Sequence, residues 1–439
     1  MNTPTAGTPP SSHTHAFATV APGIFLIPAL TMLVGWGLRG FIGGGALGAM
    51  IPGALVALAL CHCLRVPGAV SGRIAAFGAI GVGFGGQETY GQTVGFVVNG
   101  GEMFWRSVVG LGVKGAVWGF LGGAVLGVSF LRDLSRRTLF VALLLLVGGT
   151  WLGWRFVDKP KLIYFSNLLD RPREEVWAGL MLGGVGFLGW MIYALGGRAR
   201  IPVVFAVLGL VGGGLGFALG GVSFSAGMAL GGTVELYPGW KQMEFTFGLF
   251  FGAALGLAAY WLRDDIAAVT RTVIPPQSER GWSMVAGVIG SVAFGAVAIW
   301  GVGAALSVRF SYTVTGAALL ALVFLSERAA WQIAITITAG AFLLYVAKFF
   351  TLNHPVFHPV VATTMALILT AALSACVALR HASGREMPTW ALRVLLWTSV
   401  GAGVAHAGWH QEITPALIMV VVVFVIGAVI ITVRTRPRQ

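Results

Sequence analysis

The chain has 439 residues, of which 57% are hydrophobic and only 10% are charged, and its formal net charge is +13. A water-soluble protein needs about 25% charged residues to keep its surface hydrated, so this composition excludes an ordinary soluble enzyme. The basic residues are scattered singly between apolar stretches and form no stripe, which argues against a nucleic-acid partner. We therefore expect an all-α polytopic membrane protein whose main partner is the lipid bilayer.

In chain order, residues 1–20 are polar and carry no Lys or Arg, which predicts a disordered cytoplasmic tail and no cleaved signal peptide. Apolar stretches then recur to the end of the chain, many of them near the roughly 20 residues that a helix needs to cross a bilayer. Hydropathy predicts about fourteen membrane spans. The predicted spans are 21–38, 41–62, 73–87, 107–131, 138–154, 176–196, 201–221, 243–262, 282–306, 312–326, 329–349, 359–379, 390–409 and 413–433.

The distribution of basic residues predicts the orientation of these spans. With the N-terminus inside, the cytoplasmic loops collect most of the arginines, and residues 434–439 form a basic cytoplasmic tail. Cytoplasmic loops of membrane proteins carry such an excess of Lys and Arg. We expect both termini in the cytoplasm and a location in the bacterial cytoplasmic (inner) membrane. The excess positive charge would then face anionic lipid head groups.

Two segments of the chain resemble each other in the order and spacing of their residues. The pattern from Gly43 to Ile51 recurs from Gly184 to Ile192, and Leu-Arg-Asp closes both of the longer segments that contain it, at 131–133 and 262–264. This predicts a parallel 4+4 helix repeat, with unit A at 21–133 and unit B at 138–264, followed by a six-helix region at 282–433. In transporters built from parallel repeats, the binding site lies between the units. The alternative is that membrane helices share glycine patterns for packing alone.

Lys114 is the clearest candidate functional residue, because it lies inside a predicted span. A charge at the bilayer centre costs about 2.5–3.5 kcal/mol even on the lenient insertion scale, so it usually faces a partner or water. Its expected counter-charges are Glu88 and Glu102. Glu244, near the matching place in unit B, could pair with it across the repeat. The alternative is a structural salt bridge that locks the two units together.

The segment 81–92 combines five glycines with several polar side chains, among them Gln87, Glu88, Tyr90 and Gln92. Each glycine weakens a helix by about 1 kcal/mol relative to Ala. We expect a broken or re-entrant helix that lines a cavity, since irregular backbone at membrane depth needs shielding or water. An ordinary interfacial loop is the alternative. Further candidate residues for solute or ion binding are Arg39, Asn99, Glu102, Glu235, Lys241 and Glu244.

Arg39 lies in a short predicted hairpin, where it could hold an anionic substrate or cap the carbonyl groups of neighbouring helices. Histidines form a separate pattern of i, i+4 pairs, the spacing that helical metal ligands use. The pairs are His354 with His358 and His406 with His410. A Zn or Cu site there competes with ordinary interfacial histidines, and no other cofactor is expected.

No predicted loop is long enough to hold an ATPase or other catalytic domain, which needs about 50 residues or more. The leading hypothesis is a multi-pass transporter or permease for a small polar or anionic solute, with a proton as the candidate coupling ion. One alternative is an intramembrane enzyme that acts on lipid-linked or sugar substrates at the outer leaflet. Another is a structural subunit of a homo-oligomer or larger membrane complex.

Overall fold

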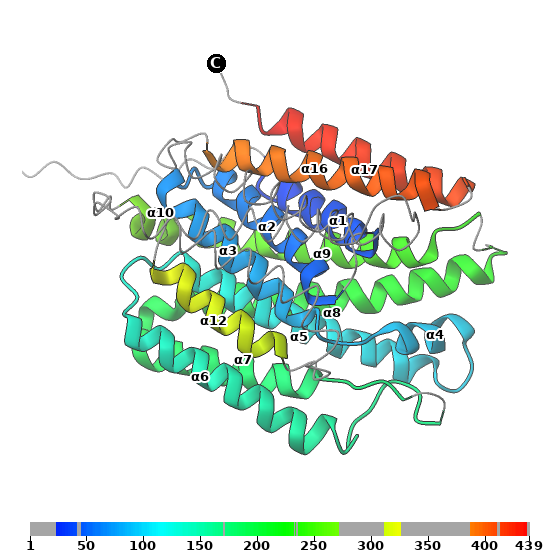
Figure 1. Cartoon of the computed structure of the whole chain (residues 1–439), viewed down its shortest axis with the longest axis horizontal. Helices are drawn as coiled ribbons and strands as arrows, with labels where there is room; N and C mark the ends of the chain where they lie inside the picture. The colour runs from blue at the N-terminus through cyan, green and yellow to red at the C-terminus, as the bar shows by residue number, and fades with distance from the viewer. Residues whose placement is uncertain are drawn as a thin grey trace, which may run out of the picture.

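The computed structural model describes residues 23–41, 45–169, 172–231, 233, 236–271, 311–325, 387–410 and 413–436. This part of the chain consists of helices and their connections and contains no strand. Figure 1 shows most of the long helices running in roughly one common direction. The predicted all-helical class is therefore confirmed.

Eight long helices lie between residues 26 and 261, and each overlaps one of the first eight predicted spans. They are α1 (Leu26–Phe41), α2 (Gly45–Cys63), α3 (Gly68–Gly85), α5 (Phe104–Ser129), α6 (Arg136–Gly153), α7 (Trp177–Leu195), α8 (Arg200–Ala229) and α9 (Gly239–Trp261). The shorter elements are α4 (Gly91–Asn99), the π-helix η1 (Trp154–Asp158), the 3₁₀ helix η2 (Gly196–Ala199) and α10 (Arg263–Arg271). Farther along the chain lie α12 (Ser311–Leu325), α16 (Met387–His410) and α17 (Pro415–Arg434).

Helix ends follow local sequence signals where these are strong. Ser135 caps α6 by accepting a hydrogen bond from the Thr138 backbone N–H, and Thr414 caps α17 through Leu417 in the same way. Pro415 then occupies the first turn of α17, where its missing N–H costs no helical hydrogen bond. Such caps satisfy backbone donors that a helix start would otherwise leave unpaired.

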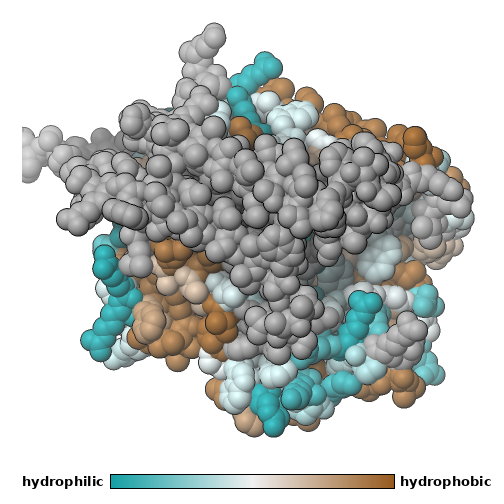
Figure 2. Space-filling view, in the orientation of Figure 1, coloured by the Kyte–Doolittle hydropathy of each residue, from teal (hydrophilic) through white to brown (hydrophobic). Residues whose placement is uncertain are grey.

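Six helical stretches in the described part are long and apolar enough to cross a membrane, and one of these contains both α7 and α8. Shorter apolar helices lie at Leu26–Phe41, Gly48–Cys63 and Tyr312–Phe324. Figure 2 shows hydrophobic residues over the lower left of the molecule, where α6 and α12 lie, bordered by hydrophilic residues. Large apolar side chains such as Phe140 and Leu144 on α6 are more than half exposed. These features fit an integral membrane protein.

A closed ring of six helices forms the centre of the described structure. Each of α1, α2, α3, α5, α8 and α9 packs along the next, and α9 packs back against α1. The α6–α7 hairpin lies outside this ring against α5, while α16 and α17 pack against α1 and α2 (Figure 1). The two predicted repeat units are therefore arranged differently, because α2 packs along α3 whereas α7 has little contact with its counterpart neighbour α8.

Glycines on α5 and α9 bring the ring helices into backbone contact. On α5, Gly115, Gly119, Gly123 and Gly127 recur every fourth residue and face the α8 backbone. A Cβ atom at Gly119 would overlap the carbonyl oxygen of Gly209. Small residues at this spacing let membrane helices approach closely, where van der Waals contact replaces the missing hydrophobic drive. On α9, Gly248, Gly252 and Gly256 form an equivalent seam against α1.

Segment 81–92 contains a break in the helix, as predicted, but only after its first five residues. Helix α3 continues through Gly81 and Gly83 to Gly85, and the break is the turn at 86–90 that precedes α4. A Cβ at Gly81 would meet Val125, and one at Gly85 would overlap the Trp118 ring. These glycines thus serve close packing against α5, which overrides their low helix propensity.

We expect Gly119→Ala to destabilise the protein by about 1–3 kcal/mol, the usual cost of adding a methylene to a filled core. The added methyl group would force α5 and α8 apart. Reversible unfolding in detergent micelles measures the change. Gly189→Ala on α7 is the matched control, because a Cβ there meets no atom within 4 Å. Equal stability of the two variants would contradict a closely packed seam.

Candidate functional site

Two groups of buried or half-buried ionisable side chains lie at one end of the helical ring. They are carried by the C-terminal turn of α1, the turn at 86–90, the first half of α5, the connection before α7, and the start of α9. We call Glu88, Lys114 and Glu175 the lysine cluster. We call Arg39, Tyr90, Lys241 and Glu244 the arginine cluster.

Lys114 forms the centre of the lysine cluster and is fully buried. Its Nζ lies 3.1 Å from Glu88 Oε1 and 2.7 Å from Glu175 Oε1. It also donates to the Thr89 carbonyl at 2.6 Å and to Thr93 Oγ1 at 3.1 Å. An ammonium group has three donors, so this arrangement satisfies all of them. The predicted pairing with Glu88 is present.

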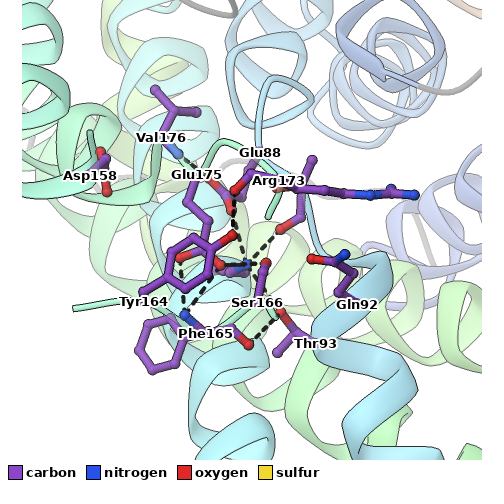
Figure 3. Close-up of polar contacts among 12 residues, drawn as sticks. Glu88, Gln92, Thr93, Asp158, Tyr164, Phe165, Ser166, Arg173, Glu175 and Val176 are labelled. Carbon is purple, nitrogen blue, oxygen red and sulfur yellow. Dashed lines mark hydrogen bonds and ion pairs between the residues drawn. The ribbon is translucent and has the colours of Figure 1, made fainter. Parts of the chain in front are cut away.

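Glu175 anchors the connection before α7 to this cluster. Its carboxylate accepts from Ser166 Oγ at 2.6 Å and from the Phe165 backbone N–H. The Val176 backbone N–H donates to Glu88 Oε2 at 2.7 Å. Figure 3 shows these groups turned toward one another, while Asp158 lies apart. The cluster therefore fixes the turn after α3 and the connection 159–176 to the same end of α5.

The lysine cluster contains two carboxyl groups and one ammonium group, so it carries one net negative charge when all three are ionised. Glu88 lies in the turn after α3, and its pKa is raised, mainly by burial and further by Glu175, although Lys114 opposes the shift. Removing a carboxylate from water is expensive unless its charge is compensated. A proton on Glu88 would remove the excess charge.

The arginine cluster lies against the same turn from the interior of the ring. Arg39 Nη1 donates to the Tyr90 hydroxyl at 2.5 Å and lies 4.0 Å from Glu244 Oε1. Lys241 Nζ lies 2.6 Å from Glu244 Oε2 and donates to the Gly37 carbonyl at 2.9 Å. Thus Lys241, not Arg39, caps a helix carbonyl, and Glu244 pairs with these two cations rather than with Lys114.

Aromatic rings surround the Arg39 guanidinium. Its central carbon lies 5.4–5.5 Å from the ring centroids of Trp36, Tyr90 and Trp118. Cation–π attraction in a site shielded from water contributes about 2 kcal/mol or more. Burial also raises the pKa of Tyr90, so its hydroxyl keeps its proton at neutral pH. Phe217 and Phe247 continue this aromatic layer across the ring.

Two buried donors, one in the arginine cluster and one beside it, have no hydrogen-bond partner among the described residues. They are Arg39 Nε and the indole Nε1 of Trp36, one turn earlier on α1. Both side chains are at least nine-tenths buried. The cluster holds two cations and one carboxylate, and thus one net positive charge. A buried donor without a partner favours binding of a hydrogen-bond acceptor, and the net positive charge favours an acceptor that is an anion.

Several other predicted site residues lie outside these clusters. Gln87 bonds to Thr313 of α12 at 2.9 Å, and Gln92 accepts from the Asn167 backbone N–H. Asn99 is exposed. Glu102 is also exposed and does not pair with Lys114, contrary to our expectation. The preceding Gly100 and Gly101 adopt φ of 70° and 78°, and this turn leaves Glu102 at the surface before α5 begins.

Two partners of Lys114 were not predicted from the sequence, namely Glu175 of the lysine cluster and Thr93, whose hydroxyl accepts from Lys114. Glu175 belongs to a loop with mixed charges, where it reads as a surface residue. The one local signal is its position next to the apolar run of α7, where a carboxylate has to find a partner. Glu235 lies outside the described residues.

The predicted metal site has no support in the described part of the chain. No group of three or more His, Cys, Asp or Glu side chains suited to a metal occurs there. His354 and His358 lie outside the described residues, and the side chains of His406 and His410 on α16 are not described. The histidine pairs therefore stay a prediction.

Comparisons with family models, with curated proteins and with solved structures found no match. The geometry of the two clusters is thus the basis for a functional assignment.

Replacing Lys114 by Met should cost about 3–5 kcal/mol of stability, because it leaves two buried carboxylates without a cation. Unfolding of the purified protein in detergent gives the measurement. Lys159→Met serves as the control, since Lys159 is exposed. Adding Glu175→Gln to Lys114→Met should restore part of the loss. A loss no larger than that of the control would contradict the network.

The stability of the protein should depend on the protonation of Glu88. Because its folded-state pKa lies above the unfolded value, the neutral carboxyl favours the folded state. This contribution is present at acidic pH and is lost as the pH rises through the folded-state pKa. Glu88→Gln should flatten that part of the curve of stability against pH. The groups that act on Glu88 are Lys114, Glu175 and Asp158. An unchanged curve would exclude Glu88 as the titrating group.

Proposed function

We propose that this protein is a secondary permease that moves a small anionic or polar solute across a membrane together with a proton. Its apolar surface and long apolar helices suit a bilayer. Buried ionisable groups of both signs gather at one end of a closed helical ring. Intramembrane charges of this kind commonly mark the path of an ion or substrate.

The division of charge between the two clusters is the observation that carries this proposal. The arginine cluster has one excess positive charge, and the lysine cluster has one excess negative charge. The clusters adjoin, because Thr89 contacts Lys114 while Tyr90 contacts Arg39. An anion beside Arg39 and a proton on Glu88 would neutralise both. Binding of each would favour binding of the other, since the pair carries no net charge into a low-dielectric site.

The contacts between residues far apart in sequence agree with a site between the predicted units. Arg39 of unit A meets Lys241 and Glu244 of unit B, and Lys114 of unit A meets Glu175 of unit B. Sites between repeats are common in transporters. We include in the proposal about fourteen spans, the 4+4 duplication and an inner-membrane location. By the positive-inside rule the clusters face outward, since Arg132, Arg136 and Arg198 belong to the opposite end.

The test is solute uptake into liposomes that contain the purified protein and a pH-sensitive dye. The wild-type protein should take up a small anion and acidify the lumen together with it. We expect Glu88→Gln to lower proton-coupled uptake at least about 10-fold, because the amide cannot carry the proton. Glu102→Gln is the matched control, since Glu102 lies exposed outside both clusters.

Glu88→Gln with wild-type proton uptake would contradict the assigned proton site. Absence of any protein-dependent flux with the wild type would contradict the permease. Stable co-purification with other membrane proteins would then favour the subunit hypothesis.

A further inference from the structure

The guanidinium group of Arg39 is held in place but only partly used. It presents two edges from which pairs of parallel N–H groups can bind an acceptor. One terminal nitrogen, Nη1, is engaged by Tyr90. The edge formed by Nε and the other terminal nitrogen has a buried Nε without a partner in the described structure. Three aromatic rings restrain the group, so this edge has a fixed direction.

We infer that the free edge of Arg39 binds the carboxylate of a small monocarboxylate, held in a bidentate manner beside Trp36. This inference rests on the proposed function, because the ligand is taken to be the transported solute. A planar carboxylate matches two parallel N–H donors, whereas a halide can use only one point of contact. The unpaired indole N–H of Trp36 supplies a further donor on the same face of α1.

The charge of the arginine cluster sets the charge of the ligand. Glu244 neutralises only one of the two cations, and it lies closer to Lys241 at 2.6 Å than to Arg39 at 4.0 Å. A monoanion therefore brings the cluster to neutrality, whereas a dianion would leave it negative. An excess charge of either sign is costly among rings that exclude water. The site thus selects a monocarboxylate over divalent phosphate or sulfate.

Glu244 does not already fill this position. Its Oε2 accepts a hydrogen bond from Lys241 Nζ, which also donates to the Gly37 carbonyl. A separation of 4.0 Å between Arg39 Nη1 and Glu244 Oε1 is an ion pair without a hydrogen bond. Arg39 therefore keeps Nε for a second carboxylate, which none of the described residues supplies and which we assign to the ligand.

Binding to the full chain in detergent or nanodiscs tests this inference. The probes are acetate, propionate and benzoate, compared with phosphate, sulfate and chloride, with saturable thermal stabilisation as the signal. Carboxylates should bind the wild type at least about 10-fold more tightly than the other anions. Arg39→Lys keeps the positive charge but removes the planar fork, and should weaken carboxylate binding at least about 10-fold. Arg198→Lys, at an exposed surface pair with Asp133, should have no effect.

Lys241→Gln provides a second test that holds even if Arg39→Lys fails to fold. It leaves one cation and one carboxylate in the cluster, so the attraction for a monoanion should fall at least about 10-fold. Wild-type carboxylate affinity in either folded variant would overturn the inference. Equal binding of chloride or phosphate by the wild type would overturn it as well.

The binding assay tests the carboxylate site and the liposome assay tests the permease, so each hypothesis can be contradicted without the other. Carboxylate binding that depends on Arg39, but without uptake into liposomes, would support the site and contradict the permease. Uptake of a solute that is unaffected by Arg39→Lys would support the permease and contradict the carboxylate site.

Discussion

Contact between the glycine backbones of α5 and α8 is the constraint on which the rest of the structure depends. With no Cβ at Gly115 and Gly119, the carbonyl groups of the two helices approach within van der Waals range. Lipid tails are as apolar as the helix surfaces, so close packing is what holds membrane helices together. The same device joins α9 to α1 through Gly248 and Gly252. These seams close the six-helix ring, and the closed ring removes its interior from both lipid and water.

A charged side chain inside this closed ring is shielded from water, so neighbouring groups have to supply its counter-charge and hydrogen bonds. The lysine cluster meets this demand for Lys114, because each of its donors has an acceptor and Glu175 holds the connection before α7 in place, but the buried Glu88 Oε1 has no hydrogen-bond partner among the described residues. The arginine cluster meets it only in part, because Arg39 Nε and Trp36 Nε1 have no partner in the described structure. The atom without a hydrogen bond is thus an acceptor in the lysine cluster, whereas the atoms in and beside the arginine cluster are donors. This difference agrees with a proton at the first cluster and an anion at the second, as proposed above.

The sequence predicted some of these contacts and failed on others. Success depended on how far apart in the sequence the contacting residues lie and on the local turns between them. The pairing of Lys114 with Glu88 was predictable, because a helical hairpin returns the chain to the same level after a short connection. The pairing with Glu102 was wrong, since the local turn at Gly100 and Gly101 keeps this residue at the surface. Glu175 was missed, because its role depends on a long connection folding back over α5. The helix breaks within segment 81–92 as predicted, but Gly81 and Gly85 lie before the break, where their contacts with Val125 and Trp118 make them packing residues of a continuous helix.

The sequence by itself determined the helical membrane class and the places where helices lie, because an apolar run of sufficient length can satisfy its backbone in lipid only as a helix. It also marked the residues that are costly to bury, such as Arg39, Lys114 and Glu244. Only the tertiary structure decided which helices are neighbours and which charge meets which. Those pairings depend on close approaches such as that of Gly119 to Gly209, between helices separated by the entire α6–α7 hairpin. Local periodicity records which face of a helix is apolar, but the identity of the helix that covers this face is a property of the whole fold.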